Sequence, residues 1–93
     1  MTSGLSDEFK IACEIYKHNQ ANEPIWYSKL KDIMSTHMDA NTVSMALNVL
    51  FDWGIIKAEY GGSESGKAAK LLYVSESAEP IIEELYRKYW SGK

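Results

Sequence analysis

The run TVSMALNVLFDWGII, residues 42–56, constrains the possible folds more than any other part of the sequence. Its apolar residues recur every three to four positions, the spacing of a helix with one buried face. Gly54 follows, and glycine readily adopts the left-handed conformation that ends many helices. Ile55 and Ile56 then open a run typical of a β-strand. The segment predicts a helix over about 40–53, capped by Asp39, that leads directly into a strand.

This predicted helix has two different faces. At 100° per residue, one face collects the apolar residues Val43, Ala46, Leu47 and Leu50, which we expect in the core. The opposite face collects Asn41, Met45, Asn48 and Asp52, which we expect to meet solvent or a partner. No lysine or arginine occurs between residues 39 and 54, so this helix offers no positive charge.

The other elements follow from the same periodicities and from cap residues. We expect a first helix over about 7–18 after Ser6, a short strand at 25–27, and a helix over about 29–36 capped by Ser28. Strands at 55–60 and 70–74 are joined by GGSESGKAA, which gives a hairpin spanning 55–74. A last helix covers about 78–91, with Pro80 tolerated in its first turn.

Composition limits the class of protein. The 93 residues fit a single domain, 1–93, and the 45% hydrophobic and 25% charged fractions are those of a globular chain. The single cysteine, Cys13, favours a reducing, cytoplasmic location and is expected to be a buried thiol. No apolar run is long enough to span a membrane, so no membrane partner is expected. The net charge of −3 gives no general attraction to a polyanion.

The order of elements, with TVSMALNVLFDWGIIKAEY inside it, resembles the winged helix-turn-helix family. The resemblance covers about residues 5–90 and is strongest to small archaeal transcriptional regulators whose C-terminal helix pairs with that of a second subunit. It implies an α+β, mainly α fold with a three-helix core, a β-hairpin wing and a C-terminal helix.

The same resemblance implies binding to double-stranded DNA and a role in transcription regulation. In the family, the helix at 40–53 lies in the major groove and the wing reaches the neighbouring backbone or minor groove. The implied base contacts are Asn41, Thr42, Ser44, Met45 and Asn48, and the implied backbone and wing contacts are Ser28, Lys29, Ser63, Ser65, Lys67 and Lys70. Asparagine can pair with adenine, hydroxyls can donate to phosphates or bases, and methionine can touch a thymine methyl. Because the helix carries no lysine or arginine, lysines of the neighbouring helix and the wing must supply the positive charge.

The apolar face of the helix at 78–91 is wide for so small a chain. It either covers the first helix of the same chain or pairs two chains as a homodimer, and we favour the dimer because such a face otherwise leaves an exposed patch. The predicted interface consists of Ile11, Ile15, Ile82, Leu85, Tyr86, Tyr89 and Trp90. A dimer would place two recognition helices in successive major grooves about 34 Å apart.

A protein-interaction module without DNA binding is the alternative function. The acidic pI of 5.3 and the absence of lysine and arginine from the helix at 40–53 favour it.

The segment GGSESGK fits the core of a phosphate-binding loop, but Ala68 stands where a serine or threonine would hold magnesium. His18 and His37 are expected at the surface or in turns, without zinc-ligand spacing. Trp26 is expected to pack in the short strand and Trp53 to seal the core against the wing. We therefore predict no enzyme, metal or cofactor.

Overall fold

The segment that leads from helix to strand folds as its sequence predicts. The computed structural model describes residues 5–61 and 69–90. In it α3 covers Ala40–Asp52 and β1 covers Ile56–Gly61. Gly54, between them, has φ +73°, and the Ile55 amide donates to the Leu50 carbonyl at 3.0 Å, which closes the end of the helix.

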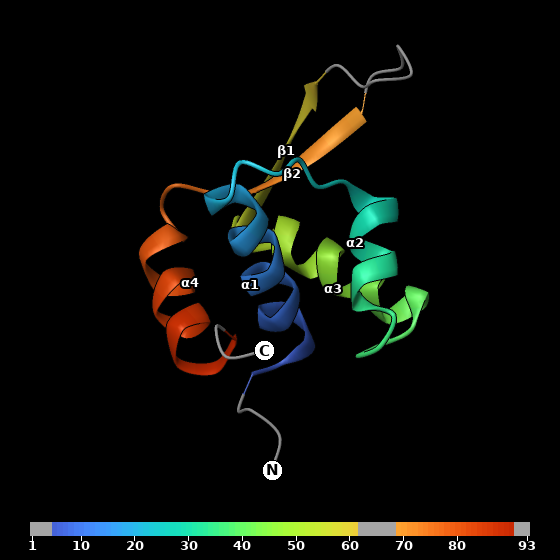
Figure 1. Cartoon of the computed structure of the whole chain (residues 1–93), viewed down its shortest axis with the longest axis horizontal. Helices are drawn as coiled ribbons and strands as arrows, with labels where there is room; N and C mark the ends of the chain where they lie inside the picture. The colour runs from blue at the N-terminus through green and yellow to red at the C-terminus, as the bar shows by residue number, and fades with distance from the viewer. Residues whose placement is uncertain (1–4, 62–68, 91–93) are drawn as a thin grey trace.

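The other elements follow the predicted order (Figure 1). The first helix, α1, runs two residues further than predicted. The hairpin is antiparallel and pairs Ile56 with Val74 at its base and Gly61 with Ala69 at its far end. The observed bounds of the remaining elements are α1 Asp7–Gln20, α2 Tyr27–Met34, β2 Ala69–Val74, α4 Glu79–Leu85 and the π-helix η1 Tyr86–Trp90.

The start of α2 differs from the prediction. Ser28 is not its cap, because the helix begins at Tyr27 and the backbone of Trp26 takes the cap position without a side-chain hydrogen bond. The Trp26 carbonyl already accepts from the Leu30 amide at 2.9 Å. The predicted strand at 25–27 is therefore reduced to one β-bridge between Trp26 and Leu71.

The core is built around α1, which packs against α3 and α4 and reaches β2 (Figure 1). Ile11 and Ile15 have no exposed surface. The predicted division of α3 is confirmed: Val43, Ala46, Leu47 and Leu50 are buried, while Asn41, Met45, Asn48 and Asp52 are exposed. Cys13 is also buried, and burial raises the pKa of its thiol to about 12.

The C-terminal helix packs on α1 of its own chain. Ile82 is fully buried and Trp90 is only 5% exposed, so these two residues, like Ile11 and Ile15, cannot join two folded copies. The predicted dimer interface is wrong for these four residues, because the apolar face covers the first helix. Leu85 and Tyr86 are half-buried, and Tyr89 is exposed.

A buried polar cluster fastens this helix to α1. The Trp90 indole Nε1 donates to Glu14 Oε1 at 2.9 Å, and His18 Nε2 lies 3.0 Å from Glu14 Oε2. The expectation of a surface His18 is therefore wrong, since its side chain packs beside a buried carboxylate. Trp53 differs in the opposite sense: it is 58% exposed, and its ring lies 6.2 Å from that of Phe9, so it does not seal the core against the wing.

Replacing Gly54 tests how the helix is joined to the strand. A Cβ at this position would meet nothing within 4 Å, so only the positive φ disfavours a side chain. We expect Gly54→Ala to lower the free energy of unfolding by about 1 kcal/mol, and Gly54→Asn to cost less, because asparagine tolerates the left-handed region. Urea unfolding measures both. Equal stability of the alanine variant and the wild type would contradict the role of the turn.

Candidate nucleic-acid interface

The exposed side of α3 is polar and carries no positive charge. Met45 is 60% exposed, and the Asn41 amide Nδ2 contacts its sulfur at 3.7 Å. Asn48 lies exposed one turn further on. This face is exposed, as predicted, and carries hydrogen-bonding groups and a thioether, but it cannot by itself neutralise phosphates.

Asp39 and Thr42 organise the start of α3. The Asp39 carboxylate accepts from the Thr42 amide at 2.8 Å and caps the helix. This hydrogen bond, with a smaller contribution from the Thr42 side chain, lowers the pKa of Asp39 below its ordinary value of 3.8. Thr42, which is half-buried, therefore has a structural role in the cap, and its contact with a base stays a prediction.

Three described lysines from the elements next to α3 each lie over an aromatic ring. The ammonium groups of Lys29, Lys31 and Lys70 lie 5.2, 5.5 and 5.6 Å from ring centroids, and the rings belong respectively to Trp26, Tyr27 and Phe51. Lys29 also donates to the Pro24 carbonyl at 3.1 Å. These contacts hold lysines of α2 and β2 at defined positions beside α3.

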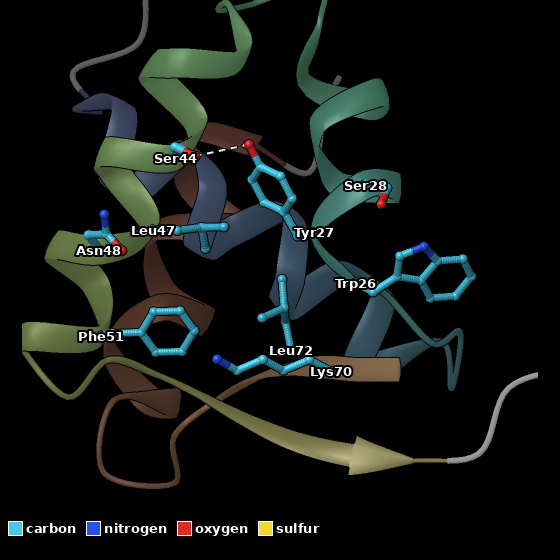
Figure 2. A pocket seen from close by; sticks show the side chains of 9 residues that line it. All are labelled: Trp26, Tyr27, Ser28, Ser44, Leu47, Asn48, Phe51, Lys70 and Leu72. Carbon is cyan, nitrogen blue, oxygen red and sulfur yellow. Dashed lines mark hydrogen bonds between the residues drawn. The ribbon is translucent and has the colours of Figure 1, made fainter. Parts of the chain in front are cut away.

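A groove of about 410 Å³ opens between the start of α2, α3 and β2 (Figure 2). Its apolar part comes from Leu47, Phe51 and Leu72, and the ring of Tyr27 lies across it. The Tyr27 hydroxyl and Ser44 Oγ are hydrogen bonded at 2.9 Å and bridge α2 to α3. The remaining described lining residues are Trp26, Ser28, Asn48 and Lys70.

The structure brings several of the predicted DNA-contacting residues to this groove. Its lining includes Ser28 from α2, Ser44 and Asn48 from α3, and Lys70 from β2. Asn41 and Met45 are exposed on the same helix as Asn48. The predicted wing contacts Ser63, Ser65 and Lys67, and the phosphate-loop pattern that includes them, lie outside the described residues.

The aromatic part of this surface was missed by the sequence reasoning. The sequence predicts Trp26 and Tyr27 in a strand, but they lie at the start of α2 and are 39% and 38% exposed. Phe51 falls between the buried and exposed stripes of α3 and points toward Lys70 in Figure 2. The available signal was the adjacent pair Trp26–Tyr27 directly before Ser28 and Lys29, which places rings beside predicted backbone contacts.

Other kinds of site find no support in the described part of the chain. Residues 5–61 and 69–90 contain no group of three or more His, Cys, Asp or Glu side chains able to hold a metal ion. Among the same residues, no helix combines the length and the apolar character needed to cross a membrane.

Solved structures share this arrangement of helices and hairpin. A PadR-like transcriptional regulator from Bacillus cereus is similar with a TM-score of 0.69 and 16% identity, over 91% of this chain and 81% of that one. The circadian clock associated protein Pex from Anabaena has a TM-score of 0.70 and 20% identity, over 95% of this chain and 79% of that one. A MarR mutant from E. coli has a TM-score of 0.62 and 20% identity, over 90% of this chain and 57% of that one.

The chain has a winged helix-turn-helix fold. Its three-helix core, antiparallel hairpin and C-terminal helix match the predicted α+β, mainly α architecture. No protein-family model and no curated protein sequence matches the chain. At identities of 20% and below, the likeness to regulators establishes the fold, so the function must be argued from this chain's own residues.

The Asp39 cap should make stability depend on pH. Because the folded pKa is lowered, the ionised carboxylate stabilises the native state above the unfolded value, and this contribution is lost as the pH falls through the folded pKa, below 3.8. Asp39→Asn keeps a cap acceptor but cannot ionise. We expect the wild type to unfold at a higher temperature than Asp39→Asn at pH 7, with the difference disappearing below pH 3.8. A difference unchanged by pH would contradict this role.

Proposed function

We propose that this protein is a non-catalytic, cytoplasmic transcriptional regulator that binds double-stranded DNA with α3 in the major groove. The observation that carries the proposal is the convergence of Ser28, Ser44, Asn48 and Lys70, from three elements, on one surface beside the exposed Asn41 and Met45. None of the described residues lining the groove carries a carboxylate. The shared fold of known transcriptional regulators agrees with this assignment.

In this proposal the charge and the sequence reading come from different elements. Asn41, Thr42, Ser44, Met45 and Asn48 meet base edges, where asparagine can pair with adenine and methionine can contact thymine. Phosphates are contacted by Ser28 and Lys29 on one side and by Lys70 and the wing residues Ser63, Ser65 and Lys67 on the other. An ammonium has three donors, and Lys29 uses one for the Pro24 carbonyl, so the other two remain for phosphate oxygens.

We further propose that the protein acts as a homodimer through the outer side of its C-terminal helix, as in the small archaeal regulators that it resembles. Ile81 is 61% exposed and Tyr89 is 39% exposed, and both lie on the helix that carries the half-buried Leu85 and Tyr86. Pairing this side with its copy would cover the apolar surface that each chain leaves open. It would also present two copies of α3 to one duplex.

A protein-interaction module is the second candidate function. The 60% exposure of Met45 on a helix without lysine or arginine favours it, because methionine adapts well to a protein partner. The described groove lining, which contains no acidic residue, and the lysines of α2 and β2 beside α3 favour DNA instead.

The dimer is tested by sedimentation of Ile81→Glu. The side chain is exposed in the first turn of α4, where a carboxylate also suits the helix dipole, so the chain itself should remain folded. We expect a dimeric mass for the wild type and a monomeric mass for the variant. Tyr60→Glu, at a 77% exposed residue on β1, is the matched control and should remain a dimer. A monomeric wild type would contradict the proposal.

DNA binding is tested by fluorescence anisotropy with a mixed-sequence duplex at several salt concentrations. Binding should weaken as salt rises, because cations are released from the phosphates that lysines neutralise. We expect Lys29→Ala and Lys70→Ala each to reduce the slope of log affinity against log salt by about 1 per protein chain.

Lys88→Ala is the matched control for these variants. Lys88 lies on the C-terminal helix beside Glu84, on the other side of the molecule from α2 (Figure 1). Its slope should equal that of the wild type. Absence of binding at low salt, or equal slopes for all three variants, would contradict the DNA interface and favour the protein-interaction function.

A further inference from the structure

The groove beside α3 is large enough to receive a small ring compound. Its volume of about 410 Å³ lies within the range of pockets that hold small organic groups. The buried side chains of Leu47 and Leu72 form its floor, and the half-buried Phe51 closes one side. Tyr27 lies across the groove from Phe51 (Figure 2). A ligand that entered here would contact rings and aliphatic side chains.

The polar groups at the rim suit a flat ring that carries an anion. Lys70 brings an ammonium to the edge, 5.6 Å from the centre of the Phe51 ring. None of the described lining residues carries a carboxylate that would repel an anion. The side chains of Ser28 and Asn48 form no hydrogen bond with other described residues, so a hydroxyl and an amide remain to recognise the edge of a ring.

We propose that this groove binds one unpaired nucleotide. The base packs against Phe51 and Tyr27 above the aliphatic floor, its edge meets Asn48 or Ser28, and its phosphate lies against Lys70. Every base has an aromatic face, so the rings would accept any of the four, and the amide would add a preference. This inference rests on the proposed function, because it assigns the DNA-binding face a second mode of contact.

The mode differs from reading a base pair in the major groove. A base within the duplex is stacked on its neighbours and presents only its edge, so its face cannot pack against the rings of the groove unless it is extruded. Extrusion costs the free energy of unpairing and unstacking the base, and a bulged base or a single strand avoids most of this cost. The groove therefore predicts a preference for DNA that contains an unpaired nucleotide.

The test compares three labelled DNAs of one sequence by anisotropy: a fully paired duplex, the same duplex with one bulged thymine, and a single strand. We expect the bulged duplex to bind about tenfold more tightly than the paired one, as a stacked base contributes in other proteins. Phe51→Leu keeps an apolar side chain but removes the ring, and it should abolish the preference. Phe9→Leu, at a half-buried ring on α1 beside Trp53, is the matched control and should retain it.

The outcomes separate this inference from the proposed function. Equal binding of paired and bulged duplexes would overturn the groove as a nucleotide site while leaving duplex recognition intact. Tight binding of the single strand alone would support the groove and overturn duplex recognition. If no DNA binds, titration with thymidine monophosphate decides: chemical-shift changes at the Asn48 amide support a site for free nucleotides, and unchanged spectra overturn the inference.

Discussion

The burial of α1 between α3 and α4 is the interaction on which the rest of this structure depends. Ile11 and Ile15 have no exposed surface, and each fully buried side chain of this size contributes about 1.5–3 kcal/mol. Because α1 holds the inner side of α3, it also decides which side of α3 faces outward. The same helix receives the C-terminal helix through Ile82 and through the hydrogen bond between Trp90 and Glu14.

The proposed DNA-binding surface depends on this packing, because α3 carries no positive charge and other elements must supply it. Lysines reach the surface from α2 and β2, where Trp26, Tyr27 and Phe51 hold their ammonium groups near ring faces. The rings that position the lysines also border the groove, so charge and shape are built by the same residues. In the function proposed here, hydrogen bonding by α3 and phosphate contact by its neighbours are separate tasks.

The errors in the sequence-based predictions share one cause. Ser28 is a good cap residue by type, but tertiary contacts start α2 two positions before the predicted bound, at Tyr27. Periodicity shows that an apolar side chain is covered, but it cannot show which element covers it. The prediction therefore assigns to a dimer interface four residues that are buried within one chain: Ile11, Ile15, Ile82 and Trp90. The sequence around His18 is typical of a surface residue, but its side chain packs against the buried Glu14. Local patterns do not contain the partner that each side chain meets.

The sequence alone determined the order of elements, the two faces of α3 and the turn at Gly54, because these depend on spacing, capping and backbone preference within short segments. It also indicated the winged helix-turn-helix fold. Only the tertiary structure decided that α4 covers its own α1, and that Tyr27, Phe51 and Lys70 border one groove. These residues are far apart along the chain, and only the packing of α2, α3 and β2 around α1 sets the distances between them.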